Sequence, residues 1–231
     1  MLYLVLYAIS GVITLVTENY ENKIFTYSAK ILLMPLLVLY LYQHTKKNIK
    51  AQLFIYLALF FSWIGDILLM FPRNIENKNC AKLLFIGGLI AFLMAHLNYI
   101  AYFYREQKIN FRKTLLFKQP YWLIPFLIYV VVFLNILFPS LGNMKTPVVA
   151  YAVIINSMAV MALNRKRVVC NKSFWWVFIG ALFFVISDSG IAINVFYKPF
   201  TAASLIIMVT YMLAQVMIIK GIIFAMSSKS A

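Results

Sequence analysis

The sequence predicts an all-α protein in which eight helices cross a membrane as one bundle. Of its 231 residues, 64% are hydrophobic and 12% are charged, whereas a soluble domain has about 45–50% and about 25%. The apolar runs continue without interruption for about 20 residues, the length that a helix needs to span a bilayer. A transmembrane β-barrel would instead show segments of about 10 residues that alternate apolar and polar side chains. A disordered tail, a coiled coil and a soluble nucleic-acid-binding domain fit this composition poorly.

Apolar runs between clusters of charge define the eight expected spans. Because no Lys or Arg precedes the run Leu2–Val16, we expect the first to be an uncleaved span and not a signal peptide. The links are too short to fold on their own, so residues 1–231 are expected to form a single transmembrane domain. The expected spans are residues 2–17, 26–43, 52–71, 83–104, 120–138, 147–163, 173–195 and 202–224.

The distribution of Lys and Arg predicts that both termini are cytoplasmic, since cytoplasmic links carry the excess of these residues. The side of the termini carries 14 of them and the opposite side 7. Trp122, Trp175 and Trp176 fall at the same cytoplasmic interface, where amphipathic rings collect. The cytoplasmic group is Lys46, Lys47, Lys50, Arg105, Lys108, Arg112, Lys113, Lys118, Arg165, Lys166, Arg167, Lys172, Lys220 and Lys229, and the outer group is Lys23, Lys30, Arg73, Lys78, Lys82, Lys145 and Lys198.

The net charge of +15 therefore indicates topology and attraction to anionic membrane lipid. We expect a multi-pass protein of the cell (inner) membrane with no nucleic-acid partner. Cys80 and Cys170 fall on opposite sides of the membrane in this topology, so they cannot pair within one chain. The chain has no CxxC motif and only two histidines, His44 and His96, a composition that disfavours a zinc site. We expect no metal and no cofactor.

Two of the six acidic residues interrupt long apolar helices: Asp66 in the third expected span and Asp188 in the seventh. An Asp in the middle of a span costs at least about 2.5–3.5 kcal/mol, so such residues usually face a cavity or a partner and mark function. The alternative is a structural hydrogen bond from a protonated Asp to a neighbouring helix. The other four lie in links or at helix ends, where we expect them to be solvated: Glu18, Glu21, Glu76 and Glu106.

Asp66 and Asp188 are expected at the same depth in the membrane. Each lies about 15 residues into a helix that starts on the cytoplasmic side. Both carboxyls are therefore expected about 22 Å from the cytoplasmic start of their helices, in the outer half of the bilayer. The residues before them also correspond, since FFSWIGD at 60–66 is similar to LFFVISD at 182–188. Because four spans separate the two motifs, they predict two four-helix repeats related by an axis along the membrane normal.

Other polar side chains at helix depth are candidates for the same cavity. Lys30, near the outer end of the second span, is expected either to pair with an Asp or an anionic head group, or to snorkel to the interface. Each of the remaining candidates is, taken alone, more often an interhelical hydrogen bond worth about 0.6 kcal/mol. They are His96, Asn98 and Tyr99 in the fourth span, Thr210, Tyr211 and Gln215 in the eighth, and the amides Asn135, Asn156 and Asn194.

The stretches around these residues have a distinctive pattern. They read AKILLMPLLVL at 29–39, GDILLMF at 65–71, GGLIAFLMAHLNYIAYF at 87–103, GALFFVISDSGIAINVF at 180–196 and TYMLAQ at 210–215. Together they resemble the YhhN-like lysoplasmalogenase family. The resemblance implies an eight-helix integral membrane hydrolase whose lysophospholipid substrate is a lysoplasmalogen. Its vinyl ether bond would be cleaved to a fatty aldehyde and glycerophosphoethanolamine or glycerophosphocholine.

The resemblance also implies roles for particular residues. The paired acidic residues of the family correspond to Asp66 and Asp188, which are the expected catalytic residues. The expected substrate-binding residues are Lys30 at the phosphate, the His/Tyr pair His96 and Tyr99, and Asn194, Tyr211 and Gln215.

Two carboxyls suit this reaction because a vinyl ether is labile to acid. One carboxyl would protonate the outer alkene carbon, and the other, ionised, would stabilise the oxocarbenium ion that water then captures. Two nearby carboxyls in a membrane cavity tend to share one proton, and the paired carboxyls of glycosidases also act on an oxocarbenium-like state.

A second class of function stays open from the sequence: a proton-coupled transporter of lipid or small solutes, with the two Asp as proton carriers. Transporters tend to break their helices with Gly or Pro at the site, and neither Asp-bearing span contains an internal Pro. An intramembrane aspartyl protease is disfavoured because its GxGD motif would need Gly where Trp63 stands. The chain contains neither the GxSxG motif of serine hydrolases nor the HExxH motif of metalloproteases.

Overall fold

The computed structural model describes residues 2–19, 23–45, 52–71 and 77–228, and within these ranges it contains helices and turns but no β-strand. The predicted all-α bundle is confirmed. Among the described residues, seven helices are long and apolar enough to cross a membrane, and the shorter apolar helix Leu2–Thr17 precedes them. The chain is therefore a multi-pass membrane protein. It divides into two compact units, Met1–Tyr99 and Ile100–Ala231, and each carries one of the two Asp.

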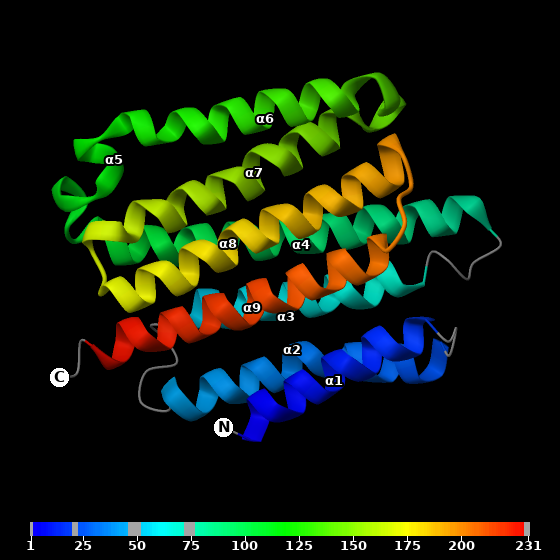
Figure 1. Ribbon diagram of the computed structural model, residues 1–231, viewed down its shortest axis with the longest axis horizontal. Helices are drawn as coiled ribbons and strands as arrows, with labels where there is room; N and C mark the ends of the chain where they lie inside the picture. Colours follow the sequence, from blue (N-terminus) through cyan, green and yellow to red (C-terminus); the bar gives the residue numbers. More distant parts are fainter. Residues whose placement is uncertain (1, 20–22, 46–51, 72–76, 229–231) are drawn as a thin grey trace. The chain divides into compact units, whose positions relative to one another are not determined.

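In the first unit, four apolar segments pack in chain order. Helix α1 (Leu2–Asn19) packs on α2 (Lys23–Thr45), and α2 packs on α3 (Leu53–Met70). Figure 1 shows α1 and α2 side by side in blue. Side-chain hydroxyls join the helices by donating to backbone carbonyls: Ser10 Oγ donates to Ala29 O at 2.6 Å and Tyr27 OH to Met70 O at 3.1 Å.

The contact between α2 and α3 follows from a proline. Pro35 lies inside α2 and has no N–H, so the carbonyl of Ile31, four residues earlier, loses its partner within the helix. In a membrane such a carbonyl must be satisfied by a neighbouring group. The indole Nε1 of Trp63 in α3 donates to Ile31 O at 3.0 Å. The tryptophan of α3 therefore satisfies the carbonyl that the proline of α2 leaves without a donor.

Helix α4 (Lys78–Lys108) approaches α3 closely in the first unit because glycines face it. A Cβ at Gly65 would lie 2.6 Å from the ring of Phe92 in α4, so a larger residue next to Asp66 would push the helices apart. At 31 residues, α4 is longer than the span expected at 83–104. A span predicted from hydropathy ends where the first charged residues appear, whereas the helix itself continues through those residues into the membrane interface. The positive charges of Arg105 and Lys108 in its last turn interact favourably with the negative end of the helix dipole.

The second unit contains the end of α4, then α5 (Leu115–Lys118), α6 (Ile124–Leu137), α7 (Lys145–Leu163), α8 (Asn171–Ala192) and α9 (Ala203–Ser227). Figure 1 shows that α6, α7, α8 and α9 alternate in direction. The most extensive packing joins α8 to α9. A Cβ at Gly221 of α9 would lie 2.9 Å from the backbone nitrogen of Val177 and 3.0 Å from Ser173 O, so only glycine permits this approach.

A buried polar cluster holds one end of the second unit together. Arg165, which is fully buried, donates from Nε to Glu106 Oε2 at 2.7 Å and from Nη2 to Ser173 Oγ at 3.0 Å. The expectation that Glu106 is solvated is therefore wrong. It lies near the end of α4, but the turn after α7 folds over it, and a buried arginine needs a charged partner. Beside this pair, Asn164 Nδ2 donates to Gln107 Oε1 at 2.7 Å.

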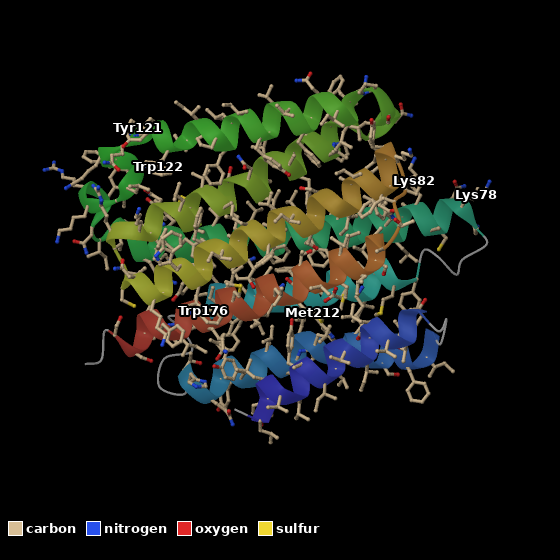
Figure 2. The ribbon with its side chains drawn as sticks, in the orientation of Figure 1. Lys78, Lys82, Tyr121, Trp122, Trp176 and Met212 are labelled. Carbon is tan, nitrogen blue, oxygen red and sulfur yellow. The ribbon has the colours of Figure 1, made fainter. Side chains whose placement is uncertain are left out.

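The structure describes some, but not all, of the Lys, Arg and Trp residues on which the topology prediction rests. Lys166 Nζ lies 5.8 Å from the ring centroid of Trp122, and Lys220 Nζ lies 5.1 Å from that of Trp176. Figure 2 shows Trp122 and Trp176 toward the same end of the second unit. The cytoplasmic placement of this end, the single-domain organisation and the four-helix repeat all stay predictions. Lys46, Lys47, Lys50, Arg73, Lys229, Glu21 and Glu76 lie outside the described residues.

Candidate active site

Asp66 lies inside the first unit with two tyrosines. It is 3% exposed and stands four residues before α3 ends at Met70. Tyr7 of α1, itself buried, interacts electrostatically with Asp66 and with Tyr99 of α4. Three helices of this unit thus bring a carboxyl and two phenol groups together in an apolar interior.

The other candidates of the first unit lie on α4 and α2. His96 and Tyr99 are both fully buried, and since they are three residues apart they share a face of α4. The structure thus brings Tyr99 to Tyr7, which also interacts with Asp66, and His96 lies one turn away on α4. Lys30 is half-buried in α2. Asn98 donates from Nδ2 to Met94 O of its own helix at 2.8 Å, which is a local structural bond.

Asp188 has a direct hydrogen-bond partner in the second unit. The hydroxyl of Tyr151 in α7 donates to Asp188 Oδ2 at 2.5 Å. Next to it, Ser189 Oγ donates its one proton to Val185 O at 2.5 Å. Ser189 Oγ is also 2.5 Å from the hydroxyl oxygen of Tyr129 in α6, and in this second bond Tyr129 is the donor. Helices α6 and α7 therefore both reach the Asp188 segment of α8.

Asp188 and Asp66 occupy matching places in their helices. Asp188 is half-buried and stands four residues before α8 ends at Ala192, as Asp66 does before the end of α3. Beyond Ala192 the chain continues as a π-helix, Ile193–Tyr197, an irregularity that is frequent at functional sites.

The remaining candidates of the second unit are less directly connected to Asp188. Asn194 lies in the π-helix and its Oδ1 accepts a bond from the backbone nitrogen of Phe200 at 3.4 Å, which holds the loop before α9. Tyr211 of α9 is buried and packs edge-on against Phe184 of α8, one turn before Asp188, with ring centroids 5.6 Å apart. Gln215, one turn further along α9, is fully buried.

The sequence did not single out the tyrosines that adjoin the two carboxyls. Tyr7, Tyr129 and Tyr151 lie in apolar runs of a chain with 15 tyrosines, where a further Tyr carries no pattern of its own. A phenol within an apolar span still needs a hydrogen-bond partner. This requirement predicts that each of the three tyrosines contacts a polar group, but it does not predict which group.

Taken together, these features define a multi-pass helical membrane protein with a carboxyl beside a tyrosine in each of two units. The chain belongs to the YhhN family, which matches residues 25–222. This confirms the resemblance seen in the sequence.

A curated human protein, Lysoplasmalogenase TMEM86B, is similar to the chain. The two are 31% identical over 162 residues, which is 70% of this chain and 59% of the human protein. The chain thus matches less than two thirds of the length of that relative. No solved structure matches this chain.

Proposed function

We propose that this protein is a lysoplasmalogenase, a membrane hydrolase that cleaves the vinyl ether bond of a lysoplasmalogen. The products are a fatty aldehyde and glycerophosphoethanolamine or glycerophosphocholine. Membership of the YhhN family and the name of the human relative support this activity. The observation that carries the proposal is the two Asp, each four residues before the end of an apolar helix and each beside a tyrosine from a neighbouring helix.

In this proposal Asp66 is the acid and Asp188 the carboxylate. Asp188 Oδ2 accepts the hydroxyl proton of Tyr151, and a hydrogen bond to an ionised oxygen is about twice as strong as one between neutral groups. This bond supports the ionised form of Asp188, and the proposal gives the acid role to Asp66.

The reaction proceeds in three steps. Asp66 transfers its proton to the alkene carbon that carries no oxygen, and the electron pair of the double bond forms the new C–H bond. Asp188 stabilises the resulting oxocarbenium ion and takes a proton from the water that adds to it. The hemiacetal then breaks its bond to the glycerol oxygen, which receives from Asp188 the proton taken from water, while the hemiacetal hydroxyl gives its proton to Asp66 and the aldehyde leaves with both carboxyls restored. General acid–base catalysis of this kind contributes about 10²–10⁴-fold.

The other candidates hold the substrate in this proposal. Lys30 meets the phosphate, while His96, Tyr99, Asn194, Tyr211 and Gln215 contact the glycerol and the reacting bond. The apolar helices around the site accept the hydrocarbon chain. The protein acts in the cell (inner) membrane with both termini in the cytoplasm, as the charge count indicates.

Product analysis of the purified full-length chain in detergent tests this function. We expect fatty aldehyde from lysoplasmalogen and none from the alkyl lysolipid, which has no alkene to protonate. Hydrolysis without any ion gradient would exclude a pure transporter.

The roles of the carboxyls are tested by Asp66→Asn and Asp188→Asn, which keep the side-chain shape but remove the acid. Each should lose at least about 100-fold in kcat, while His44→Ala, which changes the last turn of α2, should retain activity. A loss smaller than about tenfold in either Asn variant would assign that Asp a structural role.

A further inference from the structure

An apolar groove runs along the second unit between α6, α7 and α8. It encloses about 490 Å³. Helices α6 and α8 each pack on α7, so α7 forms the floor, through Asn156 and Leu163, and the other two helices form the walls. Helix α6 is poorly covered by protein: 6% of an 18-residue stretch within Pro120–Ser140 is buried, against 39% of such a stretch within Asn171–Tyr197. In the groove, α6 contributes Pro125, Phe126 and Tyr129.

The groove has the length of a lipid chain and two chemically different ends. Its lining on α8 runs from Phe174 to Ile186, about 18 Å at 1.5 Å per residue. At one end the bond from Tyr129 to Ser189 joins α6 to α8 beside Asp188. At the other end lies Lys166, whose exposed ammonium group is 5.8 Å from the ring of Trp122.

The charge at the two ends decides how an amphiphile would lie in the groove. At the first end Asp188 disfavours a phosphate. At the second end Glu106 pairs with Arg165, so it leaves the positive charges of Lys166 and Arg167 available to an anion. The indoles that line this end, Trp122 and Trp175, are 40% and 51% exposed, as is typical of side chains at the level of lipid head groups.

We propose that this groove binds one hydrocarbon chain of an anionic phospholipid from the surrounding membrane, with the lipid phosphate at Lys166. Basic pockets between transmembrane helices bind such head groups, and the volume is within the range of small-ligand sites. The bound chain packs between α6 and α8, so the lipid stabilises the second unit. The groove reaches toward Asp188, but the proposed phosphate contact at Lys166 lies at its other end, so binding of this lipid is tested without reference to hydrolysis.

Native mass spectrometry of the full-length chain in maltoside micelles, titrated with phosphatidylglycerol, tests the site. We expect one tightly retained phosphatidylglycerol on the wild type and weaker retention of phosphatidylcholine. Lys166→Gln should weaken phosphatidylglycerol binding about fivefold, the effect of one Lys near a lipid phosphate. Lys145→Gln is the matched control, since Lys145 is also exposed and also lies over an aromatic ring, Phe138 at 4.5 Å, but at the other end of α7.

A second pair of variants tests the chain-binding part. Leu182→Trp fills the groove and should abolish retention, whereas Leu127→Trp adds the same side chain on an exposed part of α6, 61% exposed at present, and should not. Phosphatidylglycerol should raise the unfolding temperature of the wild type and leave that of Leu182→Trp unchanged.

Equal binding by Lys166→Gln and Lys145→Gln, or retention of phosphatidylcholine or a neutral lysolipid in preference to phosphatidylglycerol, would overturn the proposal. Lys166 is exposed, so its replacement leaves folding intact and decides the question even where Leu182→Trp fails to insert.

Discussion

Replacing Tyr151 by Phe removes one hydroxyl group and leaves the ring in α7. The structure assigns that hydroxyl to the bond with Asp188 Oδ2 at 2.5 Å. A hydrogen bond between neutral groups in a membrane protein is worth about 0.6 kcal/mol on average, whereas a bond to a charged group is worth about 1.5–3 kcal/mol. If Asp188 is the ionised carboxylate that stabilises the cation, the larger figure applies. The kcat/KM of vinyl ether cleavage should then fall about 10- to 150-fold, since about 1.36 kcal/mol is tenfold.

Tyr129→Phe is the matched control for this experiment. It removes a hydroxyl from α6 that bonds to Ser189, a neutral partner, over the same distance of 2.5 Å. Its kcat/KM should fall no more than about threefold, which corresponds to about 0.6 kcal/mol. Both variants should be assayed in detergent with thermal unfolding measured on the same samples. Equal losses in the two variants, or a loss in Tyr151→Phe that tracks a loss of folded protein, would refute the carboxylate role of Asp188.

Two further predictions concern the fold. Trp63→Phe leaves the carbonyl of Ile31 without its donor and should cost about 1–3 kcal/mol in the free energy of unfolding; a second change, Pro35→Ala, restores the N–H of the helix and should recover much of it. A cost of Trp63→Phe that is the same with and without the Pro35→Ala change would contradict the link between the two residues. In intact cells an impermeant thiol reagent should label Cys80, which is exposed, and should reach Cys170 only after the membrane is opened. The reverse pattern would invert the predicted topology.

The helices and the two carboxyls could be predicted from the sequence because their signals are local. An apolar run long enough to span a bilayer predicts its own helix, and Asp66 and Asp188 stand out because a charge inside such a run is costly. The ends of α4 could not be predicted in this way. Its charged residues stop the apolar pattern but not the helix, which continues to Lys108.

The partners of these residues depend on which helices become neighbours, and no local pattern encodes that. Glu106 has the sequence context of a solvated residue, yet Arg165, 59 positions later, is folded onto it. Tyr151 is 37 positions from Asp188. The groove that ends at Lys166 needs three helices to form, and its lining is indistinguishable in sequence from ordinary lipid-facing surface.

The central claim is that a carboxyl protonates the outer carbon of a vinyl ether, and the fate of the solvent proton tests it most directly. The purified protein should be given lysoplasmalogen in heavy water, and the released aldehyde should be trapped rapidly and analysed by mass spectrometry. We expect one deuterium on the carbon next to the carbonyl, because that carbon receives its new hydrogen from solvent through the carboxyl. Aldehyde without this deuterium would contradict the acid role and with it the proposed mechanism.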